Sequence, residues 1–336
     1  MSAVESKERP GAEGARKGRA GTLHYAEAAA LPLLTILLAL FFTVLPATSE
    51  AFPTVANLRV TLGNQAVLII VAMAAVIPLL SEEYDFSVGA TTGLGAIYAA
   101  SALASGASIV GALAVAVAIG VAVGIVNGLL VTRARVNSVV ATLGTATLIA
   151  GTVSWKTDGK SIIQGIPDAL TNFAIGQFLG LPRSFWLAVA VTAAAYYLVR
   201  HTPYGRYLDA IGSNKSAARL LGLRVERTVL ISFVVAGALS GAAGVLLVAQ
   251  AGAASPTAGP DFTLPAIAAA FLSVAAIQPG RFNVGGAFVA IVFLAVLNSG
   301  LNLAGASSYV NDFANGGALI AGVALASLFG RRRTAG

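Results

Sequence analysis

The chain has 336 residues, of which 57% are hydrophobic and 10% are charged. A soluble domain typically carries about 25% charged residues, and a single globular core stops growing at about 250–300 residues. This composition excludes an ordinary soluble protein, and its apolar content excludes a disordered one. The absence of cysteine excludes disulfides and thiolate metal sites. We therefore expect an all-α, polytopic membrane protein.

Ten apolar segments are candidates for spanning helices, because about 20 apolar residues are needed to cross about 30 Å of hydrocarbon. The third and the eighth are short and contain glycine, proline or polar residues, so each either spans or breaks within the bilayer. The segments are residues 29–48, 62–80, 86–104, 109–131, 139–155, 185–199, 228–251, 263–277, 286–303 and 314–329.

Positive charge is distributed unevenly between these segments. Of the 21 Lys and Arg residues, four (Arg59, Lys156, Lys160 and Arg183) fall on one side of the layout and the other 17 on the side of the N-terminus. The positive-inside rule then places both termini in the cytoplasm. We expect a disordered tail over residues 1–28, a transmembrane domain over 29–330 and a basic tail over 331–336. Because the charges follow the spans, the net charge of +7 points to the lipid bilayer and not to nucleic acid.

Acidic residues cluster between the second and third segments, in the run Ser81-Glu82-Glu83-Tyr84-Asp85-Phe86-Ser87. One interpretation is a solvated turn. The other is a break within the bilayer, in which Asp85 or Ser87 caps the third helix and the acids face a water-filled cavity. On the second interpretation Glu83, Asp85, Ser87 and Asn127 are candidates for the substrate path. An asparagine at such a position more often bonds one helix to another than it binds a substrate, and Asn127 is a candidate for that role as well.

Glycines at a spacing of four indicate close helix packing, because that spacing places them on one helix face. We expect this packing mostly within one subunit, with a subunit interface or a sliding surface as the alternative. The glycines concerned are Gly120, Gly124 and Gly128 in the fourth segment and Gly237 and Gly241 in the seventh.

The longest polar segment that follows a span is residues 200–227. Pro203 and Gly205 predict a turn. Asn214 or Ser213 is placed to cap a short helix over 215–221, which Gly222 ends. Such a helix, with small and apolar residues between basic ones, either docks into a groove of another protein or lies on the bilayer surface.

Four stretches in this order resemble the permease subunits of ribose/xylose-type (monosaccharide) bacterial ABC importers. Residues 83–89 resemble the family's Ile-Asp-Leu-Ser-Val-Gly motif, and residues 140–145 with Gly151 resemble its Thr-Leu-Gly-Thr span. Residues 205–222 resemble the cytoplasmic loop that engages the ATPase. Residues 279–286, with 298–301 and 315–317, resemble the C-terminal pattern. The chain departs from the family at Glu82 and Glu83, where most members have two glycines, and at Ser273 and Val274.

The resemblance implies a translocation subunit of the bacterial inner membrane that is not itself an enzyme. Such a permease forms a dimer, here most simply a homodimer. Two cytoplasmic ATPase subunits carry the ATP and Mg²⁺, and an extracytoplasmic solute-binding protein delivers a sugar or related polyol. No cofactor is expected on this chain. The resemblance assigns the coupling loop to Gly205, Arg206, Gly212, Asn214, Ala217, Ala218 and Gly222.

Two other classes stay open at this point. An ion-coupled secondary transporter would use Glu82, Glu83 and Asp85 as cation sites. A membrane enzyme would use the same paired carboxylates, although the sequence offers no second polar constellation to complete such a site. The sequence also leaves open which solute is carried.

Overall fold

The computed structural model describes residues 28–334, and this part of the chain is almost entirely helical. Within it, the strands form one two-stranded antiparallel hairpin, β1 (Gln177–Phe178) and β2 (Leu181–Pro182). The helices are Ala28–Val44, α2 (Val55–Leu79), α3 (Val88–Ala104), α4 (Ile109–Thr132), α5 (Ser138–Thr157), α6 (Asp168–Ile175), α7 (Arg183–His201), α8 (Pro203–Ser213), α9 (Lys215–Leu220), α10 (Val225–Ala251), η1 (Pro260–Phe262), α11 (Thr263–Leu272), η2 (Ser273–Ala275), α12 (Val284–Leu303) and α13 (Ser308–Thr334).

Each of the ten predicted spans falls on a helix, so the all-α polytopic class is confirmed. Five of the described helices, α2, α4, α5, α10 and α12, are long and apolar enough to cross a membrane by themselves. Three apolar helices are shorter: Ala28–Val44, α3, and the segment that α11 forms with the short turns η1 and η2. The predicted N-terminal tail lies outside the described residues, apart from Ala28, which begins the first of these helices, and the predicted C-terminal tail continues α13 as far as Thr334.

Two helices begin six or seven residues earlier than the sequence predicted. Helix α2 starts at Val55 and not at residue 62, because Thr54 caps it by accepting a hydrogen bond from the Asn57 backbone N–H at 3.1 Å. Arg59 lies in this first part of α2, which is why an apolar stretch alone did not include it. Helix α13 likewise starts at Ser308, ahead of the polar residues Asn311 and Asp312.

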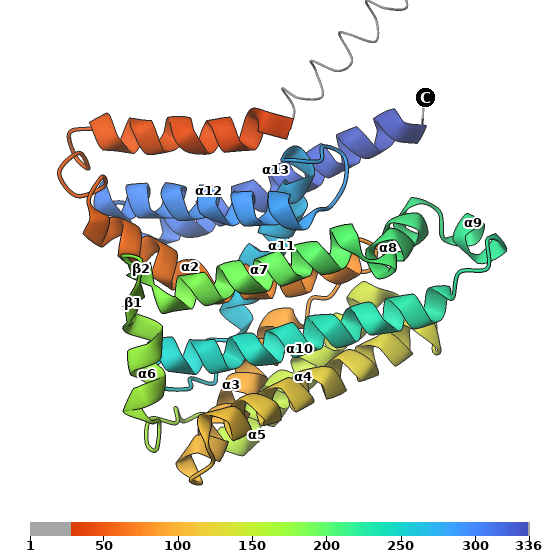
Figure 1. The fold of residues 1–336 in the computed structure, drawn as a ribbon, viewed down its shortest axis with the longest axis horizontal. Coiled ribbons are helices and arrows are strands. Elements are labelled where there is room, and N and C mark those ends of the chain that lie inside the picture. Colours follow the sequence, from red (N-terminus) through yellow and green to blue (C-terminus); the bar gives the residue numbers. More distant parts are fainter. Residues whose placement is uncertain (1–27, 335–336) are drawn as a thin grey trace, which may run out of the picture.

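Helix α10 packs most extensively on α4 and also on α3 and α2 (Figure 1). Glycines bring α4 and α10 together. A Cβ atom on Gly120 would clash with the carbonyl oxygen of Gly237, and one on Gly124 with that of Phe233. Gly128 faces Leu230, and Gly241 faces the Ala116 carbonyl. The predicted glycine faces thus lie against each other within one chain.

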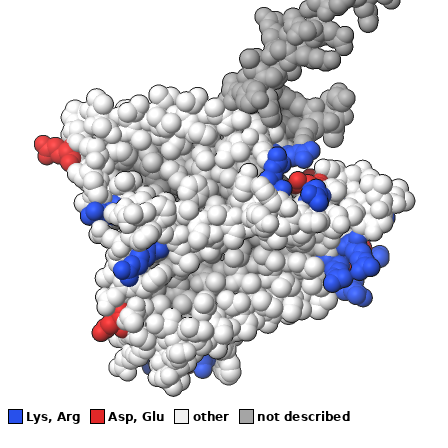
Figure 2. Space-filling model, in the orientation of Figure 1, with Lys and Arg blue, Asp and Glu red and all other residues white. Residues whose placement is uncertain are grey.

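The charged side chains gather at two opposite ends of the molecule, with an uncharged band between them (Figure 2). The start of helix Ala28–Val44 and the end of α13 lie at the same end as α8 and α9 (Figure 1). An uncharged band between two charged ends is the distribution that a bilayer imposes on a spanning protein. The arrangement therefore matches an even number of crossings, with both ends of the described residues 28–334 on the α8–α9 side.

Candidate functional site

The chain breaks between α2 and α3, over residues 80–87, near the end of the molecule that carries α8 and α9. Glu82 is exposed here and has a left-handed backbone, with φ of 58°. This conformation is costly for residues other than glycine. The next carboxylate, Glu83, is buried, at 9% exposure.

Asp85, Ser87 and Asn127 form a buried hydrogen-bond network where α3 begins. The Asp85 carboxylate accepts from the Ser87 backbone N–H at 2.9 Å and from its hydroxyl at 2.6 Å. The Asn127 amide of α4 donates to the Ser87 hydroxyl at 2.8 Å. Asp85 is thus placed to bond the start of α3, whereas Ser87, the cap residue by position, makes no side-chain capping bond. All three side chains are at most 2% exposed, so this network joins α3 to α4.

Helix α5 holds the same break from its other side. The Ser138 hydroxyl accepts from the Tyr84 backbone N–H at 3.1 Å, and the Thr142 hydroxyl accepts from the Phe86 backbone N–H, also at 3.1 Å. These bonds satisfy two backbone donors that have no helical partner. The non-helical residues 84–86 are therefore fixed to α5 by its first two turns.

The segment 200–227 contains two helices instead of a turn followed by one helix. Pro203 is the first residue of α8, a position where its missing N–H and fixed φ fit a helix well, so the predicted turn at Pro203 and Gly205 is wrong. Gly205 is buried within α8, and a Cβ there would clash with the Val199 carbonyl of α7. Arg206 is exposed on the same helix. Burial raises the pKa of the Tyr204 hydroxyl, which points to the Thr228 carbonyl at 3.4 Å.

The short helix α9 begins and ends where the sequence indicated. The Asn214 side chain accepts from the Ala217 backbone N–H at 2.9 Å, and Gly222 adopts a left-handed φ of 81° just beyond the helix. The two alanines differ in orientation: Ala217 is exposed, whereas Ala218 is 2% exposed and packs with Ile211 and Val229 of its own chain. Ala218 is therefore turned toward its own chain, and its place in the coupling loop stays a prediction. Leu220 and Leu221, at 90% and 79% exposure, form the outer surface instead.

Helix α9 is tied to the break after α2. The Lys215 ammonium donates to the Glu83 carboxylate at 2.6 Å. Immediately before α9, Gly212 lies so close to the end of α2 that a Cβ would clash with the Leu80 carbonyl. A second ion pair, Arg219 with Glu226 at 2.6 Å, is about half exposed on both sides. Glu83, which the sequence suggested as part of the substrate path, thus has its ion-pair partner on α9.

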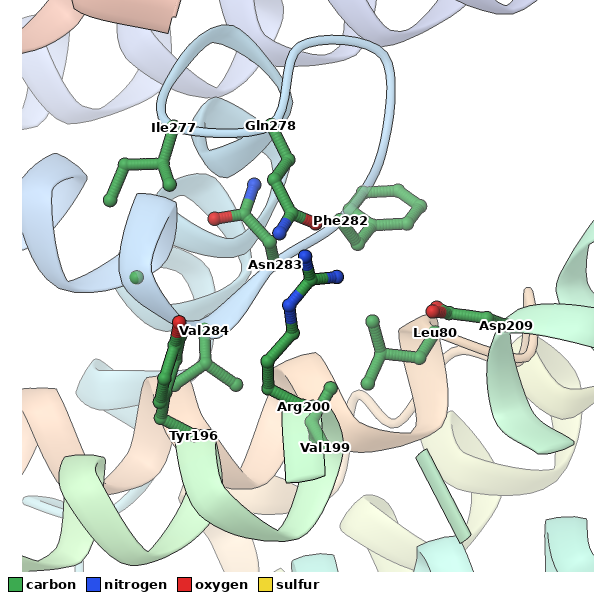
Figure 3. Close-up of a pocket in the computed structure, with 11 residues that line it drawn as sticks. Leu80, Tyr196, Val199, Arg200, Asp209, Ile277, Gln278, Phe282, Asn283 and Val284 are labelled. Atoms are coloured by element: carbon green, nitrogen blue, oxygen red, sulfur yellow. The ribbon is translucent and has the colours of Figure 1, made fainter. Parts of the chain in front are cut away.

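A second break, between α11 and α12, lies at the same end of the molecule. Helix α11 has ten residues and would cover only about 15 Å. The Asn283 side chain organises the segment that follows: it accepts from the Gly286 N–H at 2.6 Å and donates to the Ser273 and Ala276 carbonyls at 2.8 and 3.0 Å. Asn283 also lines a small cavity with Arg200 and Gln278 (Figure 3).

Aromatic rings connect the two breaks. Tyr84 stacks on Phe86 in the first break and on Phe271 of α11, with centroids 6.5 and 6.1 Å apart. Phe271 in turn makes an edge-to-face contact with Phe282 at 5.4 Å. Contacts of this type favour a defined relative position of the rings. A displacement of the first break would therefore also displace the aromatic side chains of the second.

Comparison with known proteins places this arrangement in a family. The family described as "Branched-chain amino acid transport system / permease component" matches residues 58–327. The chain belongs to this permease family. It is 35% identical to the ribose import permease protein RbsC of Escherichia coli (strain K12) over 84% of this chain and 88% of that one. It is 36% identical to the Bacillus subtilis (strain 168) RbsC over 75% and 79%. It is also 35% identical to the autoinducer 2 import system permease protein LsrC of Klebsiella pneumoniae, over 82% of this chain and 80% of that one. No solved structure gives a significant match.

The permease is accordingly a multi-pass inner-membrane subunit of an ABC importer and not an enzyme. An importer of this kind works with an ATPase and a solute-binding protein. This result sets aside both the ion-coupled transporter and the membrane enzyme that the acidic cluster left open. In the described part of the permease, no group of three His, Asp or Glu side chains is placed to hold a metal ion.

Sequence reasoning missed several residues of the permease that hold the breaks: Lys215, Ser138, Thr142 and Asn283. Thr142 and Asn283 lie in stretches that carry the family resemblance, so the sequence singled out these stretches but assigned no role to the two residues. Lys215 was included in the predicted short helix, but nothing in the sequence linked it to Glu83, which is 132 residues away. Of the four candidates for the substrate path, the structure joins Asp85, Ser87 and Asn127 by hydrogen bonds, and their place on that path stays a prediction.

Proposed function

We propose that this chain is the translocation subunit for a monosaccharide in an ATP-driven importer. The observation that carries the proposal is the similarity to ribose import permeases, which extends over most of both chains. In the proposed assembly two copies of the chain form the path, and ATP and Mg²⁺ are bound by two ATPase subunits. A solute-binding protein delivers the sugar to the end of the molecule that carries α6 and the β1–β2 hairpin.

The contact with the ATPase is proposed to be α9. Its capped ends and its packing through Ala218 make it a rigid projection, and its outer surface carries the exposed leucines Leu220 and Leu221. Exposed apolar side chains at a loop are typical of a surface that another protein covers. Movement of the ATPase pair would then displace α9 and open the path alternately to the two sides.

The function is tested by transport. The chain is reconstituted in proteoliposomes with its ATPase and its solute-binding protein, and uptake of labelled ribose is measured with ATP inside the vesicles. We expect uptake that requires ATP and binding protein and that survives an uncoupler. Uptake that persists without ATP but collapses with an uncoupler would contradict the proposal.

A second solute is favoured by one specific observation, the similarity to autoinducer 2 import permeases at a comparable level of identity. Competition distinguishes the two candidates. If autoinducer 2 is the cargo, labelled autoinducer 2 will bind to the binding protein and be taken up, and excess ribose will leave that uptake unchanged. If ribose is the cargo, excess autoinducer 2 will leave ribose uptake unchanged.

A further inference from the structure

One ion pair joins α9 to the membrane part of the chain. Glu83 lies in the break after α2, and its side chain is only 11% exposed, whereas the side chain of Lys215 is 45% exposed. The distance of 2.6 Å between them is that of a charge-assisted hydrogen bond. A carboxylate with so little access to water loses much more when its partner is removed than an exposed one does.

The residues that follow Glu83 are bonded to two membrane helices. Tyr84 and Phe86 are held through their backbone N–H groups by α5, and the Asp85–Ser87 pair is held by Asn127 of α4. Residues 83–87 lead directly into α3. A displacement of Lys215 is therefore passed along a short, bonded segment to the point where α3, α4 and α5 meet.

The pair lies beside an open groove of about 460 Å³, which is lined by α9, by the turn between α4 and α5 and by the first turns of α10. The groove gives water access to the Lys215 side of the pair but not to most of Glu83. The other ion pair of this region, Arg219 with Glu226, joins α9 only to the first turn of α10 and has both side chains about half exposed.

We propose that Glu83 is a positioning residue that holds α9 to the break after α2, so that movement of α9 is transmitted to α3, α4 and α5. The proposal rests on the proposed function, because it takes α9 to be the element that the ATPase moves. It adds a pairwise contact, Glu83 with Lys215, between α9 and the break after α2.

The test compares ATP use with transport in the reconstituted importer. The variants are Glu83→Gln, Lys215→Gln and the exchanged pair Glu83→Lys with Lys215→Glu. Glu226→Gln is the matched control, because it breaks the exposed ion pair of the same region. We expect each single variant to lower the sugar carried per ATP hydrolysed about fivefold, the effect of weakening one contact of this size. The exchanged pair should recover most of that loss, and Glu226→Gln should keep the wild-type ratio.

Hydrogen exchange provides a readout that does not depend on the solute. In the assembled importer, Glu83→Gln should speed amide exchange in α9 and also in residues 84–88, whereas Glu226→Gln should speed it in α9 at most. A wild-type transport ratio in Glu83→Gln, or an exchanged pair no better than its single variants, would overturn the proposal. If the wild-type importer carries no sugar, the proposed function fails, and the exchange pattern alone decides whether Glu83 ties the two segments.

Discussion

A single hydroxyl at residue 87 connects two helices in this protein. Ser87 donates to Asp85 and accepts from Asn127, so one oxygen atom satisfies two buried polar groups of the break and of α4. A buried carboxylate that loses a donor keeps its desolvation cost without its compensation. A substitution in this network is therefore expected to destabilise the protein more than the small size of its side chains suggests.

We predict that Ser87→Ala lowers the free energy of unfolding by about 2 kcal/mol, because it removes both of these bonds at once. Thermal melting of the purified protein in detergent measures the change. Thr91→Val, one turn further along α3, is the matched control. The Thr91 hydroxyl is buried without a hydrogen-bond partner, so replacing it with a methyl group should leave the melting temperature unchanged or raise it. A Ser87→Ala protein that melts like the wild type would contradict the network.

At the scale of elements, the close approach of α4 and α10 depends on the absence of side chains. We predict that Gly124→Ala destabilises the protein by about 1–3 kcal/mol, since its Cβ would overlap the backbone of Phe233 and Val234 and force the helices apart. Gly144→Ala is the control, because a Cβ on this glycine of α5 meets no atom within 4 Å. Melting curves of the two variants should separate clearly, and equal stabilities would show that α4 and α10 do not pack in this way.

Helix α9 carries the prediction for the partner surface. Leu220→Ser combined with Leu221→Ser should abolish co-purification with the ATPase and leave the melting temperature of the permease unchanged, because both side chains are mostly exposed. Ala218→Arg, in contrast, should lower the melting temperature of the permease, because it places a charge among the buried side chains of Ile211, Val229 and Phe233. Normal complex formation by the double serine variant would remove α9 as the docking element.

Local signals made much of these elements predictable. Apolar length located every predicted span on a helix, and the Asn214 cap and Gly222 fixed α9, because each of these depends on neighbouring residues only. The turn predicted at Pro203 was wrong, because proline suits both a turn and the first residue of a helix. Packing on α7 decides between the two. The Glu83–Lys215 pair and the inward side of Ala218 depend on how distant segments meet, which no local pattern contains.

At the scale of the whole molecule, the argument about function depends on which side of the membrane α9 occupies. Of the 21 Lys and Arg residues, all but four were assigned to the side of α8 and α9, and the structure has both ends of the described chain on that side (Figure 1). The β1–β2 hairpin lies at the opposite end, where Arg59 donates to the Gly180 carbonyl at 2.8 Å. A cytoplasmic motor can act on α9 only if the charge asymmetry has been interpreted in the right direction.

The absence of cysteine makes this orientation directly measurable, because single cysteines can be introduced into a chain that has no background reactivity. We predict that Leu179→Cys, in the exposed turn of the hairpin, reacts with a membrane-impermeant maleimide in intact right-side-out vesicles. Asn214→Cys, at the exposed cap of α9, should react only after the vesicles are made permeable. The unmodified chain provides the blank. Labelling of Asn214→Cys from the outside of intact vesicles would put α9 out of reach of any cytoplasmic ATPase and would overturn both the docking role of α9 and the mechanism built on it.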